Sequence, residues 1–226
     1  MITLEHITKT YNWKKSNAFT ALKDVSLIIE DGELVAIMGK SGAGKSTLLH
    51  ILACIDTYDE GDYHLGDQEI RNLSEGRLAR VRNEHIGLVM QDYALVEDFT
   101  VLDNVMLPLN LAKKKAKNRK QIAMEALEKV EMSEFAKKKV SELSGGQKQR
   151  TAIARAIVNE PDVLLADEPT GALDSENAET VMALFRKINE EGTTVVIVTH
   201  DGDLAQCCDR IIEIRDGEIV EEDLSA

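Results

Sequence analysis

Short runs of apolar residues recur along the chain, and each one ends at a glycine or a polar residue. The four clearest runs are 34–38, 86–90, 163–166 and 195–199. They are rich in Val, Ile and Leu and are too short for typical helices. Such runs are typical of strands buried on both faces, so the pattern predicts a parallel sheet. Polar residues follow the carboxyl ends of these strands, where open α/β sheets bind ligands.

Helical patterns separate the predicted strands. Segments 47–53 and 147–158 both continue from glycine-containing loops. In a third segment apolar residues recur at a spacing of three or four, and Gly192 follows where that helix is expected to stop. These residues are Ala178, Val181, Met182, Phe185 and Ile188. The alternation of strands and helices predicts an α/β fold.

Other segments depart from this alternation. The N-terminal part and segment 63–70 look like antiparallel strands, and 210–220 looks like a final hairpin turning at Asp216-Gly217. Segment 93–140 shows little strand signal and contains a predicted helix at 122–130. The pattern therefore predicts a mainly parallel sheet, an antiparallel β subdomain and an inserted α-helical subdomain.

Composition narrows the class of protein. The chain has 226 residues with 43% hydrophobic residues, enough for a sizeable core, and no run approaches the roughly 20 apolar residues of a membrane span. Its start lacks the features of a signal peptide, so we expect a cytoplasmic protein without direct membrane insertion. The net charge of −13 argues against a nucleic-acid partner and against adsorption to an anionic membrane. Any attachment to a membrane is then expected to run through a protein partner.

A glycine-rich loop between a predicted strand and a predicted helix carries the first chemistry. Its residues are Gly39, Lys40, Ser41, Gly42, Ala43, Gly44, Lys45 and Ser46. This is the P-loop pattern, whose glycines let backbone N–H groups cradle phosphate oxygens at a helix N-terminus. Lys45 is expected to bridge the β- and γ-phosphates, and Ser46 to supply a hydroxyl ligand to Mg²⁺. The loop predicts binding of a nucleoside triphosphate.

A pair of acidic residues ends the strand at 163–166. Asp167 is expected to hold Mg²⁺, directly or through water. Glu168 comes next, and a carboxylate beside the metal can orient or deprotonate an attacking water. The pair would be a weak signal alone, but together with the P-loop it predicts hydrolysis.

A third motif, 143–147, reads Leu-Ser-Gly-Gly-Gln and is followed by Gln149-Arg150 and by Ala-Arg-Ala at 154–156. With these motifs in this order, the chain resembles the nucleotide-binding subunit of ATP-binding cassette (ABC) transporters over about residues 2–221. The resemblance implies a P-loop, RecA-like core, ATP and Mg²⁺ as ligands, and ATPase activity coupled to transport. It also implies one nucleotide-binding domain over 1–226, with the helical subdomain inserted at about 93–157.

The resemblance assigns further roles residue by residue. It implies that Ser144, Gly145, Gly146 and Gln147 contact the γ-phosphate held by a second subunit, and that Asp174 lies in a loop crossing the dimer interface. Two glycines and a serine at a helix start form a second anion cradle, which suits this role. Two ATP molecules are then expected to lie between two subunits, and hydrolysis to open the dimer.

The remaining assignments complete the predicted ATP site. Gln91 resembles the glutamine that contacts Mg²⁺ and the attacking water, and His200 resembles the histidine that contacts the γ-phosphate. Thr47 follows the P-loop and joins the nucleotide-binding set. Tyr11 occupies the place of the aromatic residue that stacks on adenine, although Trp13 and Phe19 lie nearby in sequence.

Finer resemblance points to one branch of the family, carried by segments 37–39, 46–52, 104–109 and 166–171. That branch contains the ATPases of macrolide efflux, lipoprotein release and antimicrobial-peptide resistance. It implies a homodimer on the cytoplasmic face of the cell membrane, bound to an integral membrane permease. The alternative is an ATP-switched regulator of cell-wall or cell-division enzymes that acts through a permease-like partner. Lys40, where the branch often has proline, leaves the exact subgroup open.

Two surfaces have more than one interpretation. Segment 93–99, with apolar residues beside Glu97 and Asp98, is expected to receive a helix of the permease, or else to pack within the helical insert. The basic run 113–120 is interpreted as a solvated helix face rather than as a lipid or nucleic-acid site. An ABC ATPase of DNA repair or translation is a rival, but no long coiled-coil insertion or second cassette is visible. A simple P-loop kinase would not need the motif at 143–147.

Overall fold

The computed structural model describes residues 1–112 and 118–224. The chain forms two compact units, one made of Met1–Ala79 with Thr194–Ala226 and the other of Arg80–Thr193. The predicted helical insertion at 93–157 falls inside the second unit. Residues 113–117 of the basic run lie outside the described residues.

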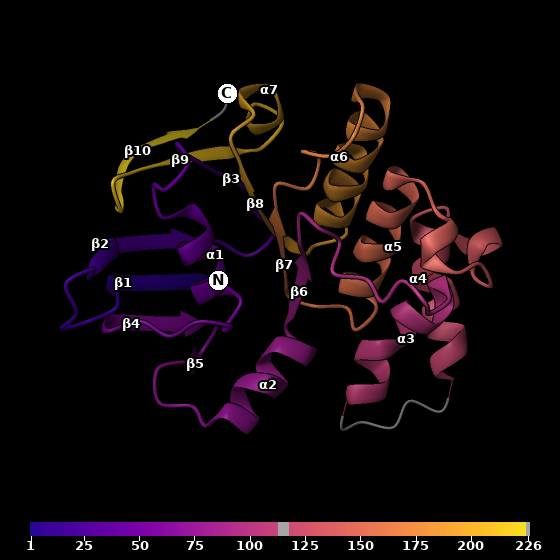
Figure 1. The fold of residues 1–226 in the computed structure, drawn as a ribbon, viewed down its shortest axis with the longest axis horizontal. Helices are drawn as coiled ribbons and strands as arrows, with labels where there is room; N and C mark the ends of the chain where they lie inside the picture. The colour runs from indigo at the N-terminus through magenta and orange to yellow at the C-terminus, as the bar shows by residue number, and fades with distance from the viewer. Residues whose placement is uncertain (113–117, 225–226) are drawn as a thin grey trace. The chain divides into compact units, whose positions relative to one another are not determined.

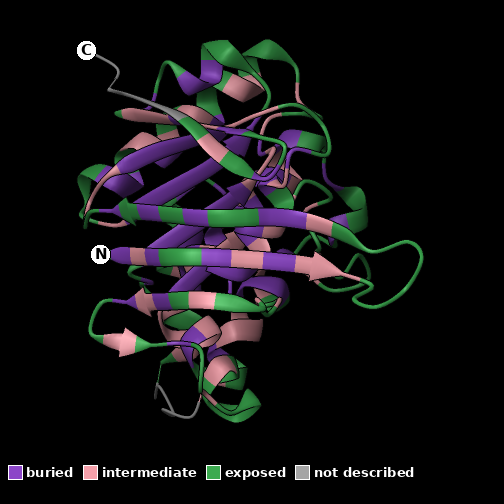
Figure 2. Cartoon of the chain, turned by 90° about the vertical axis from the view of Figure 1, so that its left-hand side faces the viewer, coloured by how far each residue is buried: buried purple, intermediate pink, exposed green. Residues whose placement is uncertain are grey.

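An antiparallel sheet forms one part of the first unit, with strand order β2-β1-β4-β5 (Figure 1). Its strands are β1 (Ile2–Tyr11), β2 (Phe19–Ile29), β4 (Glu60–Leu65) and β5 (Gln68–Glu69). Along β1 the buried Ile2 and Leu4 alternate with more exposed neighbours. Figure 2 shows buried and more exposed stretches alternating along the strand that begins at the N-terminus. This alternation is expected when one face of a sheet covers the core and the other faces solvent.

The parallel part of the first unit centres on β3 (Leu34–Met38). It pairs in parallel with β8 (Thr194–Thr199) and with β9 (Arg210–Arg215), and β10 (Glu218–Leu224) pairs antiparallel with β9. All of 34–37 and 194–199 is buried, which explains why both strands read as unbroken apolar runs. Helix α1 (Lys45–Leu52) and the short α7 (Gly202–Ala205) lie wholly within this unit.

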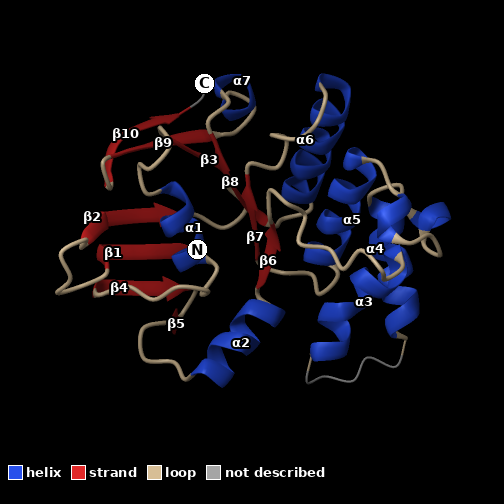
Figure 3. Ribbon diagram, viewed as in Figure 1, coloured by secondary structure: helices blue, strands red, loops and turns tan. Residues whose placement is uncertain are grey.

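The second unit joins a strand pair to a group of helices (Figure 3). Strands β6 (Ile86–Val89) and β7 (Val163–Asp167) run parallel. Its α-helices are α2 (Glu75–Glu84, which begins in the first unit), α3 (Val101–Leu111), α4 (Arg119–Lys129), α5 (Gly145–Ile157) and α6 (Ser175–Glu190). Two 3₁₀ helices, η1 (Ser133–Phe135) and η2 (Val140–Glu142), lie between α4 and α5. Helices α3, α4 and α5 pack on one another.

The structure confirms the four buried parallel strands, the antiparallel segments and the final hairpin. The helices expected at 47–53, 122–130, 147–158 and after Ala178 are present with shifted ends. No individual helix was predicted at α2 or α3, although α3 lies within the predicted helical insertion. Helix α2 buries only Val81, so it has little apolar periodicity, and α3 contains Pro108, a residue that disfavours helix interiors. Within the described residues, none of the helices has the length and apolar character needed to cross a membrane.

Candidate functional site

The predicted P-loop connects β3 to α1 in the first unit, and Lys45 is the first residue of that helix. Gly42 and Gly44 have φ angles of 81° and 107°, in the region that favours glycine. A Cβ atom on Gly44 would also lie 2.6 Å from the carbonyl oxygen of Ala21. Only glycine fits at position 44. The positive φ angles let the backbone amides of the loop point toward a ligand at the start of α1.

The side chain of Lys45 folds back over this loop. Its Nζ donates to the carbonyl oxygens of Gly39 at 2.7 Å and Lys40 at 3.3 Å. The ammonium group and the amides at the positive end of α1 together suit a phosphate group. Ser46 is exposed at the start of the helix, so its hydroxyl is accessible to a cation held with the phosphates.

His200 follows the strand next to the one that precedes the P-loop. Met38 of β3 and Thr199 of β8 are register partners, so Gly39 and His200 leave the carboxyl ends of neighbouring parallel strands. The turn is fixed by the hydroxyl of Thr199, which accepts from the Asp201 amide at 3.0 Å. Asp201 in turn caps α7 by accepting from the amide of Asp203 at 2.9 Å.

Tyr11 lies at the end of β1 and is half-buried. Its hydroxyl donates to Asp56 Oδ2 at 2.6 Å. Burial raises the pKa of Tyr11, and the hydrogen bond with Asp56 raises it further. Trp13 and Phe19, the other two aromatic residues of this region, are 65% and 56% exposed. Tyr11 is therefore more buried than Trp13 and Phe19, and its hydrogen bond to Asp56 fixes the position of its ring.

The second unit brings Gln91 close to the acidic pair. Strands β6 and β7 run parallel with Val89 opposite Ala166, so 90–91 and 167–168 follow the same edge of the strand pair. Glu168 has a φ of 43° and its carbonyl accepts from the Gly171 amide at 3.1 Å. A Cβ on Gly171 would lie 3.7 Å from Gln91 Nε2 and 3.8 Å from Glu168 Cβ. The amide of Gln91 and the carboxylate residue therefore flank one glycine.

The Ser-Gly-Gly segment begins helix α5 with a capping box. The Ser144 hydroxyl accepts from the Gln147 amide at 3.3 Å, and the Gln147 side chain accepts from the Ser144 amide at 3.0 Å. Gly145 is exposed, whereas Gly146 is buried against α6. A Cβ on Gly146 would collide with the side-chain amide of Asn177.

Asp174 caps helix α6 and holds that same asparagine. Its carboxylate accepts from the backbone amide of Asn177 at 2.9 Å and from the side-chain amide at 2.8 Å. The backbone hydrogen bond, followed by the side-chain one, lowers the pKa of Asp174. Asn177 was not singled out from the sequence, yet it joins the predicted interface loop to the Ser-Gly-Gly segment.

Two further residues of the second unit were not recognised from the sequence as shaping the loop after Gln91. Arg155 of α5 donates to the carbonyl oxygens of Tyr93, at 2.8 Å, and Ala94. Burial lowers the pKa of Arg155, while the charge of Asp92 raises it. The fully buried Asn104 accepts from the Val96 amide at 2.9 Å and donates to the Val96 carbonyl at 3.0 Å. Arg155 is 62 positions away from Tyr93, so the sequence around either residue does not indicate the contact. Asn104 looks like an ordinary polar residue of a helical segment, and its sequence gives no sign that it is buried.

A glycine loop between a buried parallel strand and a helix, with an Asp-Glu pair ending another buried strand, defines the class of P-loop nucleotide hydrolases. The family model described as "ABC transporter" matches residues 22–171. The chain belongs to the ABC transporter family and is an ABC ATPase.

Comparison with known proteins supports this assignment along the whole chain. The chain is 48% identical to the uncharacterized ABC transporter ATP-binding protein YvrO of Bacillus subtilis, covering 97% of this chain and 96% of that protein. It is 45% identical to the macrolide export ATP-binding/permease protein MacB of Escherichia coli, covering 97% of this chain and 34% of MacB. A dimeric, post-hydrolysis structure of the cassette MJ0796 bound to ADP and Pi matches with a TM-score of 0.91 and 42% identity, covering 100% of this chain and 99% of that one. MJ0796 belongs to Methanocaldococcus jannaschii.

Proposed function

We propose that this chain is the ATP-binding and hydrolysing subunit of a transporter, and that two copies dimerise around two ATP molecules. The observation that carries this proposal is the presence of two separate glycine-containing helix starts. One is the P-loop at α1, and the other is the Ser144–Gly146 segment at α5. The relative MJ0796 is described as a dimer with ADP and Pi, which supports the same assembly here.

Each residue of the proposed ATP site has a separate role. The P-loop amides, Lys45 and Thr47 bind the phosphates, and Tyr11 stacks on the adenine. Ser46, Gln91 and Asp167 would hold Mg²⁺, which would neutralise phosphate charge. Glu168 takes a proton from the attacking water, and His200 hydrogen-bonds the γ-phosphate. Ser144, Gly145, Gly146, Gln147 and Asp174 act on the nucleotide of the partner subunit.

We also propose that the dimer works from the cytoplasmic face on an integral membrane permease. MacB is described as an ATP-binding/permease protein, and this chain matches about a third of it. A permease on a separate polypeptide would correspond to the part of MacB that this chain does not match. Export, including the handling of antimicrobial peptides or lipoproteins, is the proposed role of the complex.

The test is the variant Glu168→Gln, which keeps the shape of the side chain but removes its basicity. Turnover should fall by about 10²–10⁴-fold, the usual contribution of a general base, while ATP binding is retained. Because the γ-phosphate then stays in place, the variant should accumulate as a dimer with ATP and Mg²⁺. Size-exclusion chromatography with light scattering measures the mass directly.

The wild-type chain with ADP is the matched control and should elute as a monomer. Only monomers of Glu168→Gln with saturating ATP and Mg²⁺ would contradict the shared-site model. A variant that hydrolyses ATP at the wild-type rate would contradict the assignment of Glu168 alone.

A further inference from the structure

Tyr11, Asp56 and Lys9 of the first unit form a side-chain cluster that lies outside the P-loop. Asp56 accepts from the Tyr11 hydroxyl through Oδ2 at 2.6 Å and from Lys9 Nζ through Oδ1 at 2.8 Å. Lys9 also donates to the carbonyl oxygen of Thr57 at 2.6 Å. One carboxylate therefore joins the phenol to the ammonium group.

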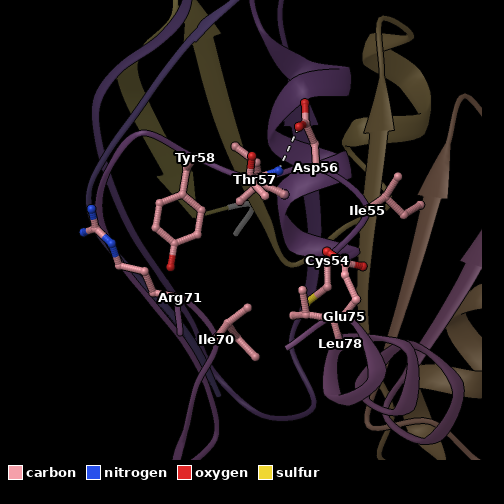
Figure 4. Close-up of a pocket in the computed structure, with 10 residues that line it drawn as sticks. Cys54, Ile55, Asp56, Thr57, Tyr58, Ile70, Arg71, Glu75 and Leu78 are labelled. Carbon is pink, nitrogen blue, oxygen red and sulfur yellow. Dashed lines mark hydrogen bonds between the residues drawn. The ribbon is translucent and has the colours of Figure 1, made fainter. Parts of the chain in front are cut away.

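Asp56 comes from the turn that ends the P-loop helix. Helix α1 stops at Leu52, Cys54 takes a φ of 54°, and the Asp56 amide donates back to the His50 carbonyl at 3.2 Å. The carboxylate also accepts from the Thr57 amide at 2.7 Å. Figure 4 shows it directed away from Ile70, which lines the opposite side of the neighbouring pocket. The turn thus presents Asp56 to β1 in a fixed orientation.

Lys9 occupies one face of the aromatic ring. Its Nζ lies 4.9 Å from the centroid of the Tyr11 ring, within the range of a cation–π contact. The Lys9 side chain is only 9% exposed, so the ammonium group depends on Asp56 and the Thr57 carbonyl as partners. With that face covered, a planar ligand would have to stack on the other face of the ring.

We propose that Asp56 and Lys9 are positioning residues that orient Tyr11 for the adenine base of ATP. This inference rests on the proposed function, in which Tyr11 stacks on that base. Asp56 fixes the hydroxyl end of the ring, and Lys9 fixes its face. Helix α1 then has two tasks, because its first turn binds phosphates and the turn after it sets the aromatic platform.

The physical gain is preorganisation. A tyrosine side chain that is already fixed loses less conformational freedom when a base stacks on it, so more of the stacking energy appears as affinity. The ionic state supports the same arrangement. Burial raises the pKa of Asp56, but the bonds from Lys9 and Tyr11 outweigh it, and the net pKa of Asp56 is lowered. The carboxylate is thus a charged acceptor at neutral pH, opposite a phenol that keeps its proton.

The test compares ATP with inorganic triphosphate, which has the phosphates but no base, by calorimetric titration of the purified full chain. Asp56→Ala should weaken ATP binding by about three- to tenfold, the usual effect of having to order one more side chain on binding. Binding of triphosphate should change by less than about twofold, because the P-loop is untouched. Lys9→Met should have the same selective effect.

A conservative change and a matched control separate positioning from folding. Asp56→Asn keeps one oxygen that can accept from the Tyr11 hydroxyl but loses the acceptor that pairs with Lys9, so it should recover part of the ATP affinity that Asp56→Ala loses. Asp59→Asn is the control in the same segment, because Asp59 accepts from the backbone amide of Thr10 at 2.6 Å rather than from the ring. Its ATP affinity should match that of the wild type. Combining Asp56→Ala with Tyr11→Phe should add little to either change, since both remove the same bond.

The outcomes distinguish this inference from the proposed function. A wild-type chain that binds triphosphate as tightly as ATP would show that the base is not recognised, which overturns the role of Tyr11 itself. If the wild type prefers ATP but Asp56→Ala and Lys9→Met keep that preference, only the positioning role is overturned. Equal weakening of both ligands would also overturn it, by showing that the substitutions disturb α1.

Discussion

Gly146 shows, at the scale of one residue, that a glycine of the Ser-Gly-Gly motif has a packing role besides any contact with phosphate. A Cβ there would collide with the Asn177 amide, which Asp174 holds in place. Gly146→Ala should therefore destabilise the chain by about 1–3 kcal/mol, the usual cost of overpacking. Urea denaturation followed by circular dichroism measures the change.

The chain offers a matched control for this substitution. Gly76 lies in α2 with nothing within 4 Å of an added Cβ, so Gly76→Ala should stabilise by about 0.5–1 kcal/mol through helix propensity. Adding Asn177→Ala to Gly146→Ala should return most of the lost stability. A Gly146→Ala chain as stable as the wild type would remove the packing role and leave only the phosphate role.

Single residues also mark where sequence reasoning stops. The P-loop, the Asp-Glu pair and the Ser-Gly-Gly motif are contiguous, so their chemistry was predicted from local spacing. Asp56 and Tyr11 are 45 positions apart, and neither sequence neighbourhood indicates the other. Such contacts arise only when the turn after α1 meets β1, which depends on the packing of the whole unit.

At the scale of elements, the starts of helices α3 and α5 carry the same capping box. Thr100 caps α3 through the Asp103 amide at 3.1 Å, and Ser144 caps α5 through the Gln147 amide at 3.3 Å. Thr100→Ala and Ser144→Ala should each cost about 0.5–2 kcal/mol of stability. If Ser144 also serves the partner's nucleotide, only Ser144→Ala should lose the ATP-dependent dimer.

This comparison is best made in the Glu168→Gln background, where the dimer accumulates. Thermal unfolding gives the capping cost, and light scattering gives the dimer fraction. Thr100→Ala controls for a frayed helix start in the same unit. Loss of the dimer in both variants would mean that stability, not the Ser144 hydroxyl, limits assembly.

Elements also differ in how far they could be predicted. Strands β3, β7 and β8 were located closely because strands buried on both faces consist almost entirely of apolar residues. Helix α3 lies within the predicted helical insertion but was not predicted as an individual helix. It contains Pro108, yet the Ala112 amide still donates to the Pro108 carbonyl, so the last turn is intact. Helix α2 is polar on nearly every side and gives no periodic signal.

At the scale of the whole molecule, the proposed link to a permease depends on how segment 93–99 is presented. Arg155 holds the carbonyls of Tyr93 and Ala94, and the buried Asn104 holds Val96. The backbone is thus fixed from within the second unit, while Val96 and Phe99 remain 41% and 43% exposed. A rigid loop with exposed apolar and acidic side chains suits a docking surface better than a packing segment.

The last prediction follows from this arrangement. Glu97 is 68% exposed and pairs with Lys148 at 3.1 Å, and Asp98 is exposed beside it. Because exposed ion pairs contribute little to stability, Glu97→Lys with Asp98→Lys should leave the fold and the ATPase rate of the isolated chain within about twofold. If the segment docks on a permease, the tagged Glu97→Lys, Asp98→Lys variant should be retained several-fold less in membranes from its own cells. The reason is that reversed charges place unfavourable like-charge contacts in the interface. Glu125→Lys with Glu128→Lys on α4 makes the same change in net charge elsewhere and should keep full retention. Wild-type retention of both double variants would exclude Glu97 and Asp98 from the docking surface, and an equal loss in both would show that net charge rather than local charge limits retention.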